Sequence, residues 1–363
     1  MGEPLTVGMV GCGAISGQYL ATLSGLPSVR LVAVADLAPQ RAEAVAAAHP
    51  GVRALTVDGL LADPGVDAVL NLTTPAAHAD VALRAIAAGK SVYGEKPFAA
   101  TTAEGRQILA AAASAGVRVG CAPDTVLGTG TQTARKAVDD GLIGRPVAAV
   151  ATMVTAGHER WHPNPDFYYQ PGGGPLFDMG SYYVSCLVTL LGPVTSVIGA
   201  ASRTRGTRTI GSGARRGEQI PVAVDSHVTG VLVHEGGALS TVVMSFDAVA
   251  TTAPPIELHG DLGSMIVPDP NTFAGQVSVR TLDAAGWRAV PESAGYRDAG
   301  RGVGLADLAA TPPGQEPRAG GAFAYHVLEV MEAMLESASA GRSIGVASHV
   351  PRPPAVPLRP AGS

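Results

Sequence analysis

Short apolar runs alternate with Ala-rich stretches over the first third of the chain. The apolar runs are typical of buried strands, and the stretches 79–88 and 103–115 between them are typical of helices. The runs expected to form strands are Leu5–Val10, Leu31–Ala35, Ala68–Leu72, Ser91–Tyr93 and Arg118–Cys121. Strands that alternate with helices need crossover connections, so this part predicts a mainly parallel, doubly wound sheet covered on both faces.

The pattern changes after Thr125, where apolar runs are separated by Gly and Pro. Short turns such as 234–237 join consecutive runs, which predicts an antiparallel meander and an α+β arrangement. Helices are expected at about 130–140, 181–191 and 323–338, and strands at 147–155, 194–201, 227–234, 239–246, 255–260, 264–268 and 276–282. The proline-rich stretch from Val350 is expected to form an extended surface strap.

The turn after the first predicted strand has the composition of a dinucleotide-binding loop. Gly11 allows a tight turn, and Gly13 leaves the backbone open to a pyrophosphate, which the N–H groups of the next helix would face. Ser16 replaces the third glycine of this fingerprint. Asp36 ends the second run, where a carboxylate can accept hydrogen bonds from ribose hydroxyls. These features predict a nucleotide site; the alternative is a βαβ crossover that binds nothing.

The cofactor preference follows from the same acid. The charge of Asp36 would face a 2′-phosphate, and Leu37 offers no compensating cation. We therefore expect NAD(H) to be preferred, with NADP(H) possible because Arg41 could reach that phosphate.

The chain of 363 residues is too long for one ordinary core. We expect a Rossmann domain of the α/β class, with a mainly parallel doubly wound sheet, over 1–122. We expect an α+β domain with a large, mainly antiparallel open sheet over 123–363.

Composition narrows the function classes. A net charge of −5 without a Lys/Arg run argues against nucleic acid or anionic membrane as the main partner. The sequence opens directly into a strand and has no long uncharged apolar run, so we expect a cytoplasmic enzyme. Cys12, Cys121 and Cys186 lack metal-ligand spacing and are expected to be buried small hydrophobes.

Two constellations carry candidate chemistry. Glu95-Lys96-Pro97 follows a predicted strand and would place a cation beside a nicotinamide pocket; the alternative is a solvated Glu95–Lys96 pair. Asp178 and Tyr182 are spaced to share one helix face, so a carboxylate and a phenol could form a proton-transfer pair near an ammonium that lowers the phenol pKa. Alternatively, Asp178 caps the helix and Tyr182 is a core aromatic.

Further candidates would contact substrate. Asp124, at the predicted domain junction, could bind sugar hydroxyls or belong to a structural turn. His158, Trp161 and His162 lie in the most aromatic stretch of the chain, residues 158–169. Its rings suit the apolar face of a sugar, which predicts a substrate-pocket loop; the alternative is a packed connector. A zinc site at His158 and His162 is disfavoured because Pro163 and Pro165 make this stretch a loop, so no metal is expected.

Together the blocks GCGAIS, TTPAAH, AGKSVYGEKP, GGGPLFDMG and HVLEVMEAM resemble the Gfo/Idh/MocA family of oxidoreductases over nearly the whole chain. The resemblance implies NAD(P)-dependent redox chemistry on sugars or polyols and a C-terminal open sheet that makes homodimers or homotetramers. It also implies a cis Lys96–Pro97 peptide. With the fingerprint, it points to a cofactor site of Gly11, Gly13, Ala14, Ile15, Asp36, Arg41, Thr73, Pro75, His78, Glu95 and Lys96.

The resemblance also implies catalytic roles. Lys96 would orient the nicotinamide ribose and a substrate hydroxyl, and Asp178 would orient or polarise the substrate or the proton donor. Members that act on inositol carry histidine where this chain has Tyr182, so tyrosine becomes the expected acid/base and inositol a less favoured substrate.

The expected activity is hydride transfer between nicotinamide and a sugar-like carbinol or carbonyl carbon. One alternative is an enzyme that holds NAD tightly and cleaves or epimerises a sugar through transient oxidation. The other is a nucleotide-sensing regulator, which the intact Lys96, Asp178 and Tyr182 argue against.

Overall fold

The computed structural model describes residues 3–312 and 314–361. The chain divides into two compact units by its internal contacts. Unit 1 consists of the described parts of Met1–Gly128, Ala294–Leu328 and Val356–Ser363, and unit 2 consists of Thr129–Ser293 and Glu329–Ala355.

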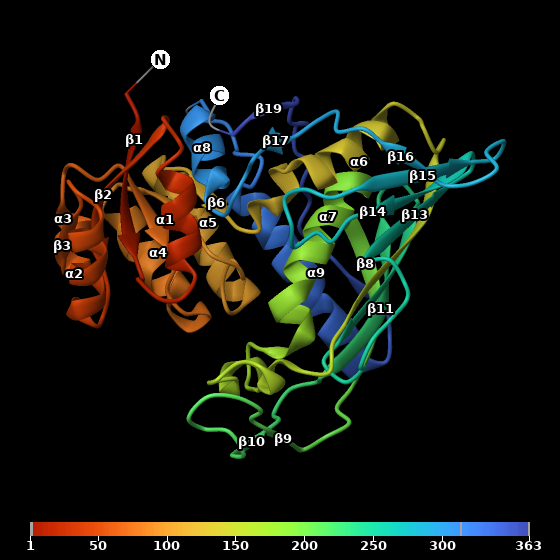
Figure 1. Ribbon diagram of the computed structural model, residues 1–363, viewed down its shortest axis with the longest axis horizontal. Helices are drawn as coiled ribbons and strands as arrows, with labels where there is room; N and C mark the ends of the chain where they lie inside the picture. Colours follow the sequence, from red (N-terminus) through yellow and green to blue (C-terminus); the bar gives the residue numbers. More distant parts are fainter. Residues whose placement is uncertain (1–2, 313, 362–363) are drawn as a thin grey trace. The chain divides into compact units, whose positions relative to one another are not determined.

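Unit 1 is built on a six-stranded sheet with the order β3-β2-β1-β4-β5-β6, in which every neighbouring pair is parallel. Its strands are β1 (Leu5–Val10), β2 (Val29–Ala35), β3 (Arg53–Leu55), β4 (Ala68–Asn71), β5 (Ser91–Gly94) and β6 (Val119–Cys121). The helices that flank it are α1 (Ser16–Leu23), α2 (Pro39–Ala48), α3 (Val57–Ala62), α4 (His78–Ala87) and α5 (Thr102–Ala115) (Figure 1). This confirms the predicted doubly wound sheet and adds β3, which is too short and too exposed to show as an apolar run.

The strand order reverses between β1 and β4, which are both central. In open α/β sheets, ligands bind beyond the carboxyl ends of the strands at this reversal. The glycine turn after β1 and the polar loop after β4 both lie there, so the fold brings the predicted cofactor residues of these loops to one edge.

Unit 1 also contains chain that the predicted boundary at 122 leaves out. In the apolar helix α8 (Val303–Ala310), Leu305 and Leu308 are buried in the same core as Met9 and Leu70. The Cys121 N–H donates to the carbonyl of Ala319 at 2.9 Å, which covers the open edge of β6. Two further short strands, β17 (Tyr296–Arg297) and β19 (Arg359–Pro360), pair with each other. The first core and the sheet edge therefore need these C-terminal segments, and the division differs from two consecutive domains.

Unit 2 contains a nine-stranded sheet with the order β16-β15-β14-β13-β7-β12-β11-β8-β18. Its strands are β7 (Pro146–Val154), β8 (Val194–Ser202), β11 (His227–His234), β12 (Leu239–Ser245), β13 (Ile256–Gly260), β14 (Gly263–Val267), β15 (Val277–Thr281), β16 (Arg288–Val290) and β18 (Ile344–Gly345). All neighbours are antiparallel except β7 and β12, which are parallel. The mainly antiparallel sheet is confirmed, but β7 lies between β12 and β13 and interrupts the simple meander.

Helices cover one face of this sheet: α6 (Thr129–Asp139), α7 (Ser181–Leu191) and the part of α9 (Gly321–Ala340) from Glu329 on (Figure 1). Gly199 in β8 permits the close approach of α9, since a Cβ there would lie 2.2 Å from the carbonyl oxygen of Met334. The opposite face carries the exposed apolar side chains Val150, Ile198 and Leu239.

Unit 2 has two long connections that contain short elements outside its main sheet. The one from β7 to α7 holds two short 3₁₀ turns, η3 (His158–Arg160) and η4 (Asp166–Tyr169), and a π-helical turn, η5 (Leu176–Gly180). The one from β8 to β11 forms a small hairpin of β9 (Thr207–Thr209) and β10 (Gln219–Pro221).

The cysteines and the proline-rich stretch follow the expectations only in part. Cys121 and Cys186 are buried, whereas Cys12 is only partly buried because it lies in the loop after β1; all three are free thiols. Residues 350–356 of the proline-rich stretch form no helix, but Val350 and Val356 are buried rather than exposed. Among the described residues, no helix has the length and apolar character needed to cross a membrane.

Candidate functional site

Two glycines, Gly11 and Gly13, have different roles in the turn between β1 and α1. Gly11 has φ +101°, and a Cβ there would lie 2.6 Å from the carbonyl oxygen of Leu72, so no other residue fits. A Cβ on Gly13 would meet none of the described atoms within 4 Å. Helix α1 follows directly, with Ile15 at its N-cap and neither a side-chain cap nor an acid in its described first turn. An uncapped N-terminus beside open backbone fits a pyrophosphate.

Asp36 is fixed at the end of β2 beside this turn. One carboxylate oxygen accepts from the Cys12 N–H at 2.8 Å, and the other accepts from the Ala38 N–H at 2.8 Å. Since each carboxylate oxygen can accept more than one hydrogen bond, Asp36 keeps the capacity to bind ribose hydroxyls. The neighbouring Leu37 is 96% exposed. Arg41, in α2, is exposed, and its charge opposes the burial and the Asp36 carboxylate that raise the pKa of Cys12 to about 11.

The loops after β4 and β5 are tied together by His78. Its Nδ1 lies 2.8 Å from the carbonyl oxygen of Pro97, and its Nε2 lies 3.1 Å from that of Thr73. Burial lowers the pKa of His78, and the neutral ring can donate to only one of these carbonyls. Pro75 begins the 3₁₀ turn η1 (Pro75–Ala77) just before α4. His78, at 3% exposed, therefore holds the loops after β4 and β5 together from inside.

Glu95 fixes the backbone next to Lys96. It is 8% exposed; one of its oxygens accepts from the Tyr19 hydroxyl at 2.8 Å, and the other accepts from the Lys96 N–H at 2.9 Å. Burial, followed by the charge of Glu95, raises the pKa of Tyr19 well above its usual range. The alternative of a solvated pair is wrong for Glu95, which is an internal anchor. The Lys96–Pro97 peptide is cis, as expected.

Asp124 is enclosed in unit 1. Its side chain is fully buried, and one carboxylate oxygen accepts from the N–H groups of Gly302 and Gly304 at 2.8 and 3.0 Å. Burial raises its pKa to about 6, against the lowering effect of these two bonds. A carboxylate used in this way favours the structural alternative over contact with a sugar, because the loop before α8 needs it as an acceptor.

Asp178 and Tyr182 lie at the start of α7, but not on one regular helix. Asp178 belongs to the π-helical turn η5, and α7 begins at Ser181, so their spacing spans two helix types. π-helical turns are uncommon and occur frequently at functional sites. The N-caps are Pro175 and Gly180, so Asp178 is not a cap, while Tyr182 is buried, as the core alternative expects.

His158 contacts Asp178 directly. Its Nε2 lies 3.0 Å from a carboxylate oxygen of Asp178, and both side chains are largely buried. The ring lies between Phe246 and Tyr168, with centroid separations of 4.5 and 4.7 Å. Within the described residues, the buried His158 Nδ1 has no hydrogen-bond partner. The structure thus joins two predicted site residues from separate segments.

The aromatic stretch has both buried and exposed side chains. Glu159 and Tyr169 are buried, whereas Trp161 is 58% exposed. His162 contacts the Trp161 ring at 5.4 Å between centroids, and its pKa is lowered mainly by burial. The stretch is therefore neither a simple packed connector nor a free loop.

The three glycines before Asp178 pack against this stretch. A Cβ on Gly173 would lie 2.3 Å from the Phe167 carbonyl oxygen, and Gly172 and Gly174 have φ of +86° and +88°. The missing side chain at Gly173 therefore lets the aromatic stretch approach the backbone closely.

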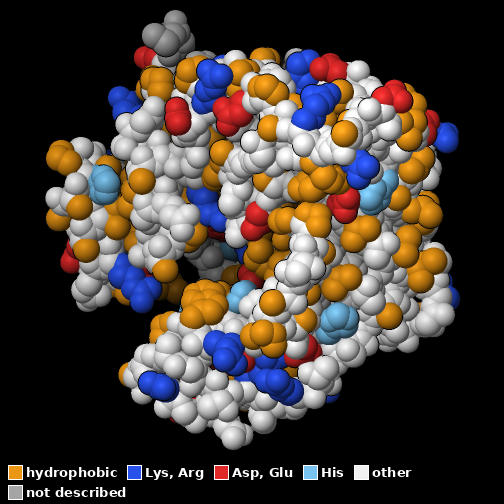
Figure 2. Space-filling view, turned by 45° about the vertical axis from the view of Figure 1, so that its right-hand side comes forward, with side chains coloured by type: hydrophobic (Ala, Val, Ile, Leu, Met, Phe, Trp, Pro, Cys, Tyr) orange, Lys and Arg blue, Asp and Glu red, His pale blue; other side chains and the backbone are white. Residues whose placement is uncertain are grey.

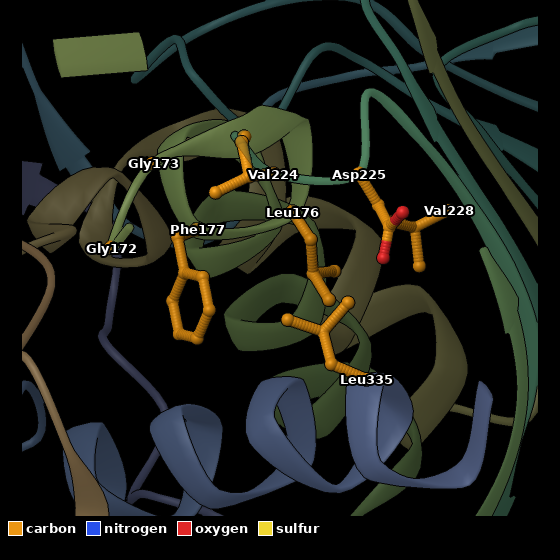
Figure 3. Close-up of a pocket in the computed structure, with 9 residues that line it drawn as sticks. Gly172, Gly173, Leu176, Phe177, Val224, Asp225, Val228 and Leu335 are labelled. Atoms are coloured by element: carbon orange, nitrogen blue, oxygen red, sulfur yellow. The ribbon is translucent and has the colours of Figure 1, made fainter. Parts of the chain in front are cut away.

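A pocket of about 170 Å³ opens beside the glycine run, and Asp178 is not among its lining residues. Figure 3 shows Leu176, Val228 and Leu335 projecting toward one space with the Asp225 carboxylate at its side. Its lining is mainly apolar: Gly172, Gly173, Gly174, Leu176, Phe177, Val224, Asp225, Val228 and Leu335. In the described part of the chain, no group of three or more His, Cys, Asp or Glu side chains could hold a metal ion.

The residues around His158 were not among those predicted from the sequence. Tyr168 lay inside the aromatic stretch but was not singled out, and Phe246 only marked the end of a predicted strand. Arg208 lies in a polar, Gly- and Arg-rich segment whose sequence shows no strand pattern. Their roles appear only in the three-dimensional contacts, in which Tyr168 and Phe246 lie against the His158 ring and Arg208 pairs with Glu159.

A parallel sheet with this strand order, a glycine turn after β1 and an acid at the end of β2 are typical of a dinucleotide-binding Rossmann unit, which this chain combines with a mainly antiparallel unit. Residues 5–122 match the oxidoreductase family with an NAD-binding Rossmann fold, and residues 131–266 match the GFO/IDH/MocA C-terminal domain. The chain therefore belongs to the Gfo/Idh/MocA family of oxidoreductases and is an enzyme of that class.

Named relatives act on several compounds. Inositol 2-dehydrogenase of Rhizobium meliloti (strain 1021) is 29% identical over 71% of this chain and 74% of its own length. D-apiose dehydrogenase of Paraburkholderia graminis is 26% identical over 98% and 93%. The 1,5-anhydro-D-fructose reductase of Ensifer adhaerens is 33% identical, but over only 39% of this chain and 43% of that relative.

Solved structures show the same fold. An NAD binding oxidoreductase from Klebsiella pneumoniae has a TM-score of 0.80 and 23% identity, covering 95% of this chain and 100% of that one. Levoglucosan dehydrogenase, in complex with NADH and L-sorbose, has a TM-score of 0.79 and 21% identity, covering 95% and 99%.

The role of Asp124 makes a pH-dependent prediction. Because its folded pKa, about 6, lies above the ordinary value of 3.8, the folded protein binds this proton more tightly than the unfolded chain. That stabilisation is complete below the ordinary pKa and is lost as the pH rises through the folded pKa. We expect it to contribute roughly 1–3 kcal/mol of fall in unfolding free energy between about pH 4 and pH 7.

Asp124→Asn should remove this contribution, since an amide does not titrate and its oxygen can still accept from both glycine N–H groups. Denaturant unfolding of wild type and variant at the two ends of the pH range measures the difference. An identical pH dependence in both proteins would contradict the assignment.

Proposed function

We propose that this protein oxidises or reduces a sugar-like carbinol or carbonyl carbon with NAD(H), in net redox turnover. The observation that carries the proposal is the pair of Asp178, held by His158, and the buried Tyr182 at the start of α7, in a family of NAD-binding oxidoreductases. The names of the relatives support a sugar or polyol substrate.

The cofactor residues proposed are those at the carboxyl edge of the unit 1 sheet. NAD(H) would supply or accept the hydride when bound. Gly11, Gly13, Ala14 and Ile15 would face its pyrophosphate, and Asp36 its adenosine ribose. The Thr73–Pro75 loop, braced by His78, and the turn at Lys96, anchored by Glu95, would border the nicotinamide end.

The proton and the substrate are assigned to unit 2 residues together with Lys96. Tyr182 would exchange the hydroxyl proton, and Asp178 would accept a hydrogen bond that orients the reacting group. Trp161 and His162 would present ring faces to the apolar side of a sugar. Fixed charges beside a developing alkoxide supply the electrostatic support that hydride transfer needs.

A substrate panel tests the proposal. Purified protein is mixed with NAD⁺ and with sugars and polyols, or with NADH and keto-sugars, and the change in NADH absorbance is followed. We expect turnover that continues well beyond one equivalent of enzyme. Conversion of a sugar with no accumulation of NADH or NAD⁺ would contradict net redox chemistry.

Asp36 should set the cofactor preference. Since placing like charges together costs several kcal/mol, kcat/KM for NADH should exceed that for NADPH by at least roughly tenfold. Asp36→Ser should narrow this ratio mainly through a lower KM for NADPH, and Arg41→Ala should not. A wild-type preference for NADPH would overturn the assignment.

Tyr182→Phe should separate chemistry from cofactor binding. Loss of the phenol oxygen should lower kcat by roughly 10²–10⁴-fold and leave the NADH Kd nearly unchanged. Lys96→Ala should change both, because a charge beside the ribose acts in the ground state and in the transition state. Steady-state kinetics and NADH titration measure the two effects; near-normal turnover in Tyr182→Phe would mean that another group is the acid/base.

The open face of the unit 2 sheet supports a homodimer or homotetramer. One row crosses β7, β12, β11 and β8 through Val150, Thr241, Val231 and Ile198, which the strand pairing places side by side. None of the four is charged, and three are exposed, Val231 being partly exposed. Figure 2 shows orange hydrophobic side chains spread over this part of the surface. Contiguous exposed apolar patches commonly mark interfaces.

We therefore expect a solution mass of two or four times 36.5 kDa. The double change Val150→Glu and Ile198→Glu should lower it to one chain, because each interface would bury several carboxylates. Thr207→Glu, outside the sheet face, is the control. Analytical ultracentrifugation checks this, and an unchanged mass of the double variant would place the interface elsewhere.

A further inference from the structure

A buried arginine of the β9 hairpin joins two carboxylates from different segments of unit 2. The Arg208 side chain is 1% exposed and forms ion pairs with Glu159, in the aromatic stretch, and Asp247, just after β12. The side chains of Glu159 and Asp247 are 4% and 8% exposed. Such an arrangement is costly in desolvation and exists only where the geometry is good.

The two terminal nitrogens of the Arg208 guanidinium bond to two different segments of unit 2. Nη1 donates to the Glu159 carboxylate at 3.2 Å and to the carbonyl of Ala156 at 3.3 Å, both in the segment that carries His158. Nη2 donates to the carbonyl of Phe246 at 3.1 Å and to Asp247. The His158 ring lies against Phe246, so Arg208 holds both the backbone beside the imidazole and the wall that it contacts.

Further bonds extend the network, in which the buried Nε of Arg208 has no hydrogen-bond partner among the described residues. The Tyr169 hydroxyl donates to the second oxygen of Glu159, and the Ser226 hydroxyl donates to the second oxygen of Asp247 at 2.7 Å. The Arg208 guanidinium carbon lies 5.3 Å from the Tyr169 ring centre. Gly157 is required at the start of this loop, since a Cβ there would lie 2.1 Å from a Glu159 oxygen.

We propose that Arg208 is a positioning residue for the reaction: through Glu159 on one side and Phe246–Asp247 on the other, it fixes the His158 ring that holds Asp178. This inference rests on the proposed function only for its catalytic consequence. The chain of contacts runs from Arg208 to Glu159 and Phe246, then to His158, and then to Asp178 at 3.0 Å. Arginine suits this position because its planar fork reaches two carboxylates and two carbonyls at once, which an ammonium cannot do.

A matched control exists in the same loop. Arg215 pairs with Asp166 through two hydrogen bonds of 2.6 and 3.1 Å, but its side chain is 33% exposed and that of Asp166 43%. This second arginine restrains the outer part of the aromatic stretch, and among the described residues its ion-pair partners are Asp166 and Glu218, not the groups that Arg208 holds. A general stiffening of the loop would require both arginines, whereas positioning of His158 requires Arg208.

The test uses Arg208→Lys, which keeps the charge but removes the fork, and Glu159→Gln, which keeps the shape but removes one charge. Arg215→Met is the control. Misplacement of a reacting group by about 1 Å can cost 10²-fold in rate, so kcat should fall roughly 10- to 100-fold in both Arg208→Lys and Glu159→Gln. The NADH Kd, which depends on unit 1, should stay within about twofold, and Arg215→Met should keep normal kcat.

A second readout does not depend on turnover. In ¹⁵N-histidine NMR of the full chain, with the His158 signal assigned by loss in His158→Gln, the wild-type ring should show one fixed tautomer with the proton on Nε2 toward Asp178. Arg208→Lys and Glu159→Gln should move this signal toward the averaged values of a mobile ring, and Arg215→Met should not.

Altered His158 signals together with a lower kcat support the inference. Altered signals in a protein with no activity on any substrate would support the positioning and count against the proposed function. Variants that only unfold at lower temperature, with normal kcat and an unchanged His158 signal, would show a purely structural role and overturn the inference. So would a fall in kcat with an unchanged His158 signal.

Discussion

The contact between His158 and Asp178 joins the aromatic stretch to the π-helical turn η5 just before α7, and the arrangement of the unit 2 site depends on it. One partner comes from a loop rich in Pro and Gly, which has little structure of its own. The other comes from a π-helical turn that directs its carboxylate toward that loop. A hydrogen bond between two largely buried groups that can both carry charge is strong only if neither group moves, so the surrounding residues must supply rigidity.

Unit 1 follows the same principle with different groups. Asp36, Glu95 and His78 each direct side-chain hydrogen bonds to backbone atoms of the loops at the carboxyl edge of the sheet. The turn at Gly11 is closed to any side chain, and the space beside Gly13 is open. The candidate cofactor surface therefore consists mainly of backbone groups held in place from behind, which favours recognition of a pyrophosphate and riboses by position rather than by flexible side chains.

Much of the fold could be predicted from the sequence because local signals agree with the tertiary structure. The strands of unit 1 are buried on both faces and read as apolar runs, and α7 was predicted with its observed bounds of 181–191. The failures have physical causes. β3 is short and exposed, the parallel pairing of β7 with β12 leaves no local pattern, and α8 joins the first core across a long sequence separation. A boundary drawn along the sequence could not show that last contact.

Spacing within one segment was enough to predict the local positions of candidate residues, as for Gly11, Gly13, Asp36, Asp178 and Tyr182. The candidate site was not predictable where a role depends on contacts between segments. Asp124 looked like an available carboxylate and is an internal acceptor for a loop that lies far along the chain. Nothing local showed that Glu95 is buried and anchors the backbone of Lys96, and Arg208 gave no signal at all.

The central claim is that hydride passes between a carbinol carbon and the nicotinamide in net turnover. The most direct measurement uses the best sugar or polyol of the panel, labelled with deuterium at the oxidised carbon, and detects the label by NMR of the recovered cofactor. The account predicts one deuterium at C4 of each NADH formed, in equal amount to the oxidised product. Deuterium that stays in a cleaved or epimerised sugar, with no labelled NADH released, would contradict it.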